Sequence, residues 1–288
     1  MTLSTIIVTF NNENHIDTSL ASLPWEGVCM EAWVIDNRSS DRTRERIEAF
    51  HRIRPQRAVQ KIWNPSNQGY ASAVNRGLRS CTGEFILLLG PDAKVLPGSV
   101  ESMICFLKTH PDVGIVAPQL LHPGGGIQPS CRRFPTYADA FAELSGLPRA
   151  FHRRCTPAWK MPDFNHTSLR EVDQPEATAI MTRRQALRDV GLMDERFSMF
   201  FNDVDWCRRF ITRGWKIVFY PDAHIEHKRG ASVLAHPIPM IWKSHQGFYR
   251  YFQKYNTAIW QTWVNQAVGL LLILTATFRT LARLIKYR

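Results

Sequence analysis

The amino-acid sequence predicts an α/β protein with a mostly parallel sheet and helices on both of its faces. The main observation is that apolar runs typical of strands alternate with helix-like segments over the first 120 residues. The predicted strands are Ser4–Phe10, Ala32–Asp36, Gln60–Trp63, Phe85–Leu89 and Val113–Ala117. The predicted helices are Asn14–Leu23, Asp41–Phe50, Ser72–Ser80 and Ser99–Thr109.

A second observation is that polar residues follow the strands, at Asn11, Asp36, Asn64 and Asp92. In open α/β sheets, ligands bind outside the carboxyl ends of the strands, so these positions are candidates for a site. No glycine-rich dinucleotide or P-loop motif follows any strand, which disfavours a dehydrogenase and a P-loop NTPase.

The second half of this region is less regular. Gly124–Gly126 is expected to form a flexible hairpin turn. Residues 135–170 contain several prolines and basic residues, and we expect a long loop or a small helical insertion that acts as a substrate lid. A second ordered block is expected from Val172 to Tyr220.

The positive charge is concentrated at the C-terminus. The chain has a formal net charge of +11, and from His227 to Arg288 it contains no Asp or Glu but nine Lys and Arg residues. Together with Trp242, Trp260 and Trp263, this composition suits an anionic membrane surface better than a nucleic-acid groove. Nucleic-acid binding is the minority alternative and leaves the acidic strand ends unexplained.

The strongly apolar part of this tail, Ala267–Phe278, is shorter than the ~20 residues that a membrane span needs. We therefore expect an interfacial or re-entrant helix, with basic residues from Arg279 to Arg288 beside it. The alternative is an amphipathic helix that packs on the core or forms a homodimer contact. The six cysteines form no CxxC pair, which favours a reducing compartment.

Two strand ends carry candidate carboxylates. Asp36 can accept a hydrogen bond from a nucleobase N–H, whereas a capping role explains Asp41 better. Asp92 follows a strand of buried aliphatic residues and could hold Mg²⁺ against a diphosphate, or could be a plain turn residue.

A third acidic fragment contains Asp203 and Asp205. On a helix these two side chains point to different sides, so one could be a general base and the other a charge at the helix N-terminus. Further on, His227 could share a metal ion with Asp92.

In combination these segments resemble the family 2 glycosyltransferases of the GT-A fold, in their bacterial rhamnosyltransferase-like branch. The resemblance covers residues 3–232 in the family's order. Its motifs are Ile6–Asn12, Val34–Asp41, Asn67–Ala71 with Asn75–Gly77, Gly90–Asp92, Gly191–Phe197, Asn202–Asp205, and His227 with Gly230 and Ser232.

The resemblance implies an inverting, metal-dependent glycosyl transfer. Asp203 would be the general base, with Asp205 as runner-up, and Asp92 with His227 would hold Mg²⁺ or Mn²⁺ on the donor diphosphate. The nucleotide-sugar site would comprise Thr9, Phe10, Asn11, Asp36, Asn37, Asn67, Gly69 and Asn75.

The implied donor is dTDP-L-rhamnose, with a UDP-hexose as the alternative. The implied acceptor is a lipid-linked or nascent surface glycan at the cytoplasmic face of the cell membrane. Gly90 replaces a polar residue of the metal motif, Asn202 stands in the usual Glu-Asp pair, and Ala177-Thr178 replaces a Gly-Ala step. These departures keep a non-catalytic glycan-assembly scaffold as a second alternative.

The expected organisation has two parts. Residues 1–232 form the transferase domain, with a nucleotide-sugar half (1–120) and an acceptor and catalytic half (121–232). Residues 233–288 form a helical tail that associates with a membrane.

Overall fold

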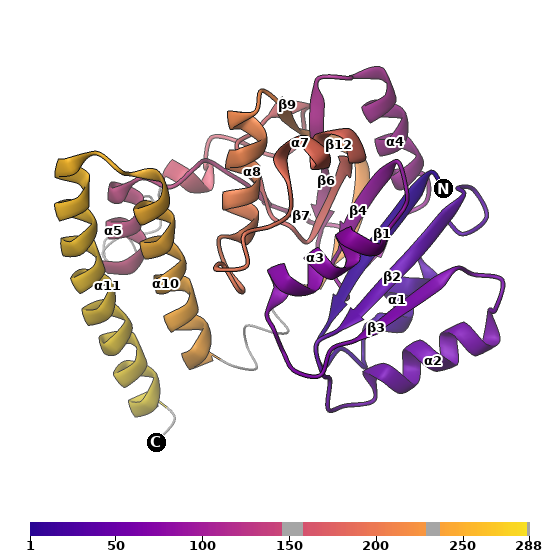
Figure 1. Ribbon diagram of the computed structural model, residues 1–288, viewed down its shortest axis with the longest axis horizontal. Coiled ribbons are helices and arrows are strands. Elements are labelled where there is room, and N and C mark those ends of the chain that lie inside the picture. The colour runs from indigo at the N-terminus through magenta and orange to yellow at the C-terminus, as the bar shows by residue number, and fades with distance from the viewer. Residues whose placement is uncertain (146–157, 229–236, 287–288) are drawn as a thin grey trace.

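The architecture is a large mixed sheet covered by helices, with a helical layer at one end (Figure 1). The computed structural model describes residues 1–145, 158–228 and 237–286. In spatial order the main strands are β3 (Val59–Trp63), β2 (Met30–Asp36), β1 (Leu3–Thr9), β4 (Phe85–Leu89), β11 (Ala179–Arg183), β6 (Val113–Leu121), β12 (Lys216–His227) and β5 (Ala93–Val95). This order confirms the predicted α/β fold.

The two faces of the sheet follow from alternation along its strands. In β1, Leu3 and Ile7 belong to one buried cluster, whereas Ile6 and Val8 belong to the other. The first cluster receives α1 (Ile16–Ala21), α2 (Thr43–Ile53) and α4 (Ser99–Thr109). The second cluster receives α3 (Tyr70–Ser80), α7 (Arg184–Val190) and α8 (Asn202–Thr212). Helices therefore cover both faces, as predicted.

The strand directions bring the loops after β1, β2, β3 and β4 to one edge. These four strands all run parallel to one another. Leu3 of β1 lies opposite Met30 of β2 on one side and Phe85 of β4 on the other. Strand β11 is antiparallel to β4 and β6, whereas β12 is parallel to β6. The carboxyl ends that the sequence singled out thus meet at one site.

Smaller elements complete the part of the chain after residue 120. The predicted glycine turn is confirmed, because Gly124 and Gly125 adopt φ values of 100° and 98° between β6 and the antiparallel β7 (Ile127–Gln128). The other short elements are β8 (Cys131–Arg132), α5 (Tyr137–Ser145), the 3₁₀ helix η1 (Ala158–Lys160), β9 (Arg170–Glu171) and β10 (Gln174–Pro175). The predicted lid at 135–170 includes residues 146–157, which lie outside the described ranges.

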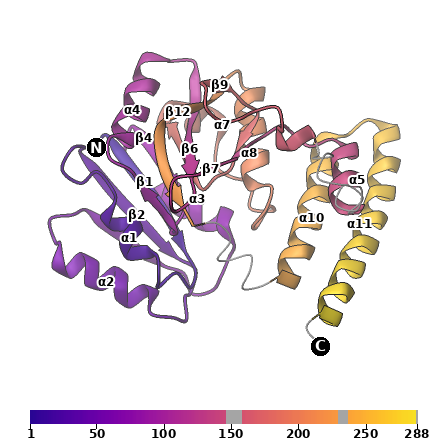
Figure 2. The ribbon, with the colours of Figure 1, turned by 180° about the vertical axis from the view of Figure 1, so that it is seen from behind.

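The tail forms α10 (Pro237–Tyr255) and α11 (Ile259–Lys286), which lie with α5 next to α8 (Figures 1 and 2). A third apolar cluster joins this layer to the sheet domain and includes Phe201, Phe248 and Leu272. The predicted boundary at 232/233, with Gly230 and Ser232 of the expected closing motif, lies outside the described residues.

Helix α11 corrects one expectation about length. The predicted length of the apolar segment rested on Ala267–Phe278 alone. In the structure one continuous helix contains a predominantly apolar segment of 27 residues, Ile259–Ile285. At 1.5 Å per residue this stretch is about 40 Å long, which exceeds the ~30 Å hydrocarbon core of a bilayer. Length and composition are therefore compatible with a membrane span, although a core helix of a soluble protein can have the same composition.

The exposed face of α11 is apolar. Its exposed large side chains recur at spacings of three, four or seven residues, which place them on one side of a helix. They include Trp260, Trp263, Leu270, Leu274, Phe278, Leu281 and Ile285. The opposite face is buried at Asn265, Leu272 and Ala276. The helix is thus held on the protein by one face and presents a continuous apolar stripe on the other.

Candidate active site

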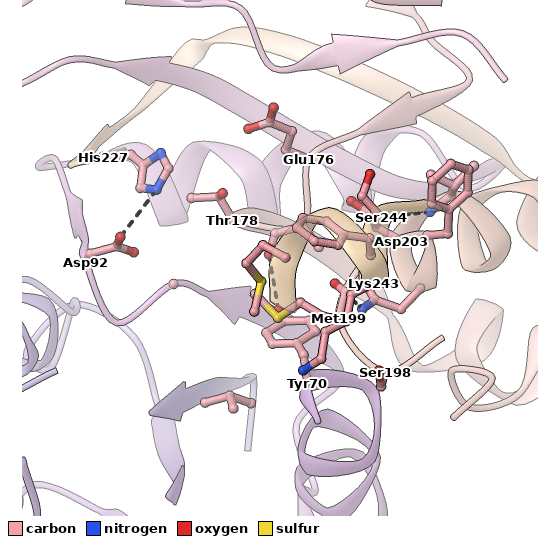
Figure 3. Close-up of a pocket in the computed structure, with 18 of the residues that line it drawn as sticks. Tyr70, Asp92, Glu176, Thr178, Ser198, Met199, Asp203, His227, Lys243 and Ser244 are labelled. Carbon is pink, nitrogen blue, oxygen red and sulfur yellow. Dashed lines mark hydrogen bonds and ion pairs between the residues drawn. The ribbon is translucent and has the colours of Figure 1, made fainter. Parts of the chain in front are cut away.

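An open cavity of about 1650 Å³ lies at the carboxyl ends of β1 and β4 and extends to α10 (Figure 3). In Figure 3, Asp92 and His227 lie on one side of it, and Asp203, Lys243 and Ser244 lie on the other. The sequence-predicted site residues that line it are Thr9, Phe10, Asn11, Asn37, Asn67, Gly69, Asp92, Asp203 and His227. Asp36, Asn75 and Asp205 do not line it.

The loops after β1 and β2 form one cross-linked wall. Asn11, with a left-handed φ of 57°, donates its backbone N–H to Ser39 Oγ at 2.9 Å, and its side-chain oxygen accepts from Ser40 N at 2.8 Å. Asn37 Nδ2 donates to the carbonyl oxygen of Gly69 at 3.2 Å. These bonds fix the polar wall of the cavity before any ligand binds.

Asp36 lies beneath this wall and is fully buried. Its carboxylate accepts hydrogen bonds from Thr9 Oγ1 at 3.0 Å and from Ser39 N at 3.0 Å, and it forms an ion pair with Arg44 Nε at 2.5 Å. The Ser39 hydroxyl is a fourth donor to this carboxylate, so a hydrogen bond from a nucleobase would require one of the four donors to move away.

Asn75 is also buried away from the cavity. Its side-chain oxygen accepts from Met193 N at 2.9 Å, and its amide nitrogen donates to Met193 O at 2.9 Å and to Glu195 Oε1 at 2.9 Å. In this structure Asn75 therefore ties α3 to the segment that precedes α8.

Asp92 and His227 face each other across the end of the sheet. His227 Nε2 lies 3.6 Å from Asp92 Oδ2, and His227 Nδ1 lies 2.7 Å from Gln128 Oε1. A carboxamide oxygen can only accept, so Nδ1 carries a proton and donates it to Gln128, and Nε2 is the ring nitrogen that faces Asp92. An imidazole Nε2 and a carboxylate that face each other could together hold a divalent cation, with the lone pair of Nε2 as one ligand.

The glycine before this pair has a steric explanation. A Cβ atom at Gly90 would lie 3.0 Å from Asp92 Oδ1, and the Gly90 N–H donates to the carbonyl oxygen of Thr178 at 2.7 Å. The missing side chain therefore leaves room for the Asp92 carboxylate beside β11. Among the described residues no group of three or more His, Cys, Asp and Glu side chains could hold a metal, so any ion here would need ligands from the substrate or water.

Asp203 occupies the first turn of α8 and faces the cavity. Its Oδ2 accepts from Gln174 Nε2 at 3.0 Å, and its Oδ1 accepts from Val204 N at 2.9 Å. Burial raises the pKa of the Asp203 carboxyl above the ordinary value of 3.8; nearby Glu176 also raises it, and the Val204 N–H opposes the shift. The position and the raised pKa are both suited to proton transfer.

Asp205 has a different environment on the opposite side of α8. It is fully buried and pairs with Arg209 Nε at 3.0 Å and with Lys254 Nζ at 2.5 Å. It also accepts a hydrogen bond from the Tyr255 hydroxyl at 2.7 Å. Asp205 thus joins α8 to α10, and the structure separates the two catalytic candidates.

The cavity wall opposite the loops after β1 and β2 was not predicted from the sequence. It includes Gln174, Glu176 and Trp159, together with Lys243 and Ser244 of α10. Glu176 pairs with Arg132, whose guanidinium lies 5.1 Å from the centre of the Trp159 ring. No local motif marks these residues, and the basic composition after His227 predicted a helical tail that associates with a membrane, not a wall of the cavity.

Residues 4–166 match the family model described as Glycosyl transferase family 2, which is more than half of the chain. The chain belongs to glycosyl transferase family 2. It is therefore a glycosyltransferase, as the sequence motifs predicted.

Curated relatives agree with this membership. An N-acetylglucosaminyl-diphospho-decaprenol L-rhamnosyltransferase of Mycobacterium tuberculosis is 25% identical over 277 residues, covering 90% of this chain and 86% of that protein. A pre-mycofactocin glycosyltransferase of the same species is 30% identical over 169 residues, covering 59% of this chain and 32% of that protein.

Solved structures confirm the GT-A fold. The mannosyltransferase PcManGT from Pyrobaculum calidifontis, in complex with GDP-Man and Mn²⁺, has a TM-score of 0.60 at 18% identity and covers 98% of this chain and 74% of that one. S. aureus TarS 1-349 in complex with UDP-GlcNAc has a TM-score of 0.56 at 17% identity and covers 86% and 65% of the two chains.

Proposed function

We propose that this glycosyltransferase moves L-rhamnose from dTDP-L-rhamnose to a glycan carried on a lipid diphosphate, with inversion at the anomeric carbon. The observation that carries the proposal is one cavity with the Asp92–His227 pair on one side and the Asp203 carboxylate on the other. The name of the mycobacterial relative, which aligns over 90% of this chain, supports the sugar and the type of acceptor.

The Asp92–His227 pair fits a divalent cation. Carboxylate oxygen and imidazole nitrogen together suit Mn²⁺, and the carboxylate also suits Mg²⁺. When bound, such an ion would neutralise negative charge on the donor diphosphate as it leaves. Gln128 would contribute by accepting a hydrogen bond from Nδ1 of His227, which orients the ring with Nε2 toward Asp92.

Asp203 acts as the general base. Its carboxylate removes the proton from the acceptor hydroxyl, the resulting oxygen attacks the anomeric carbon, and the bond from that carbon to the diphosphate oxygen breaks on the opposite face. The raised pKa of Asp203 makes its carboxylate a stronger base, and Gln174 orients it through the 3.0 Å hydrogen bond.

The remaining predicted residues form the donor pocket. Thr9, Asn11, Asn37 and Asn67 supply its polar wall, and Asp36 supports that wall from below. The apolar stripe of α11 attaches the enzyme to the cytoplasmic face of the cell membrane, where a lipid-linked acceptor lies.

Calorimetric titration with dTDP-rhamnose and UDP-hexoses, with and without Mn²⁺, tests this proposal. The unaltered protein is expected to bind dTDP-rhamnose in a metal-dependent manner, and Asp92→Asn is expected to lose that dependence. Asp189→Asn, an exposed position on α7, is the matched control. Preferential binding of a UDP-hexose would replace the proposed donor, and binding of no nucleotide sugar would favour the scaffold alternative.

A further inference from the structure

The N-terminal half of α10 forms a wall of the active-site cavity rather than a separate appendage. The residues that it places in the cavity lining share one helical face and are Pro239, Met240, Lys243, Ser244 and Phe248. Figure 3 shows Lys243 and Ser244 on the same side of the cavity as Asp203, away from the Asp92–His227 pair. A side chain on this wall therefore faces the acceptor, not the donor diphosphate.

Lys243 is exposed on this wall, and within the described residues it makes no hydrogen bond or ion pair. Other cations of the cavity wall and of the contact between α8 and α10 are engaged. Arg132 pairs with Glu176, Lys254 pairs with Asp194 at 2.8 Å, and Arg208 donates to the Tyr251 hydroxyl at 2.6 Å. A lysine ammonium that lines a cavity without an anionic partner is available to an anionic group of a ligand.

The surroundings of Lys243 indicate what kind of ligand carries that anion. Met240 and Phe248 flank it in the cavity lining, and Trp242, beside it in the sequence, is 41% exposed. Helix α10 packs against α11, whose outer face is the apolar stripe that begins at Trp260. A ligand that places an anion at Lys243 and apolar groups against the neighbouring side chains has the chemistry of a phosphate linked to a long hydrocarbon chain.

We infer that Lys243 is a specificity-determining residue that binds the phosphate groups of a lipid-diphosphate-linked acceptor. The acceptor sugar then reaches Asp203 while its hydrocarbon chain leaves past the apolar side chains of α10 toward α11. This inference rests on the proposed transfer to a lipid-linked acceptor. It adds the residue that distinguishes such an acceptor from a free glycan.

The test compares two acceptors with the full-length protein in detergent micelles. The first is N-acetylglucosamine linked through diphosphate to a short isoprenoid, and the second is an octyl glycoside of the same sugar without phosphate. Lys243→Gln should raise the KM for the first about 10- to 100-fold, as expected for loss of a charge-assisted hydrogen bond. It should leave the KM for the second and the Kd of the nucleotide sugar unchanged.

Two further variants act as controls. Lys243→Arg keeps the charge and should retain most of the affinity for the diphosphate acceptor. Lys108→Gln removes an exposed lysine on α4, away from the cavity, and should change neither acceptor KM. Equal changes for both acceptors, no change for either, or a loss of donor affinity in Lys243→Gln would each overturn the inference.

A binding measurement separates this inference from the proposed function. Calorimetry with the diphosphate-linked sugar alone should show the same weakening in Lys243→Gln, whether or not turnover is observed. Failure of the unaltered protein to bind any nucleotide sugar would refute only the proposed transfer. If Lys243→Gln instead weakens binding to phosphatidylglycerol vesicles and leaves acceptor binding unchanged, Lys243 contacts bilayer lipid and the inference is wrong.

Discussion

The two sides of the cavity are built in different ways. The proposed donor side comes mainly from loops at the ends of adjacent parallel strands, and nearly all its polar residues lie before residue 93. The proposed acceptor side combines β10, α8 and α10, and contacts such as Gln174 to Asp203 and Phe201 to Phe248 join segments far apart in the chain. A sheet edge positions the donor side, whereas tertiary packing positions the acceptor side.

The largest expected effect separates catalysis from donor binding. Asp203→Asn removes the proposed base and should lower kcat by about 10²- to 10⁴-fold. The donor side is untouched, so the Kd for nucleotide sugar and the melting temperature should match those of Asp189→Asn. Steady-state kinetics and calorimetry on the same samples measure both. A variant that keeps full activity would show that another group accepts the proton.

Asp205→Asn should affect stability instead of chemistry. The change leaves Lys254 and Arg209 without their buried carboxylate, and loss of one partner of a buried ion pair costs about 3 kcal/mol or more. Chemical denaturation should report this loss. A stable Asp205→Asn protein with strongly reduced kcat would reverse the roles assigned to the two aspartates.

Gly247→Ala probes how α10 positions the catalytic helix. A Cβ atom at this position would lie 2.6 Å from Phe201 Cδ2, and Phe201 adopts a left-handed φ of 68° just before α8 begins. Such overpacking costs about 1 to 3 kcal/mol. We expect a lower melting temperature and a lower kcat, because displacement of Phe201 moves the start of the helix that carries Asp203.

The neighbouring substitution Gln246→Ala is the control for this change. Gln246 is exposed on the same helix, so its replacement should leave both the melting temperature and kcat as they are. An unchanged kcat in Gly247→Ala would mean that α10 does not set the position of Asp203.

The smallest effect is a shift in the pH profile. Folding raises the pKa of Asp203, mainly through burial, so the base becomes protonated and kcat falls as the pH decreases through a value above 3.8. This acidic limb should disappear from the residual activity of Asp203→Asn. If the midpoint of the acidic limb lies at or below pH 3.8, the catalytic base is in a more polar environment than the buried Asp203 carboxylate.

The same contrast explains what could be predicted from the sequence. Strand and helix order, the glycine turn and the donor-side loops follow from local patterns of apolar and polar residues. The choice between Asp203 and Asp205 does not, because it depends on Lys254 and Tyr255, about fifty residues away. The hydrogen-bond donors around the buried Asp36 could not be predicted either, because the packing of α2 places Arg44 beside it.

The tail shows a further limit of local reasoning. Asn265 lies just before Ala267–Phe278, the strongly apolar part predicted from the sequence. In the structure Asn265 is buried, accepts from the Tyr137 hydroxyl at 2.6 Å and donates to Asn256 O at 3.0 Å, so it interrupts neither the helix nor its exposed stripe. A polar residue on the inner face thus does not shorten the apolar outer face.

The most direct test of the two-sided cavity is a crystal structure with dTDP-rhamnose and Mn²⁺ bound. The account predicts the metal ion about 2 Å from Asp92 and His227, the diphosphate on it, and the anomeric carbon directed toward the Asp203 side. Density for the diphosphate at Lys243, with no metal between Asp92 and His227, would contradict the assignment of the two sides.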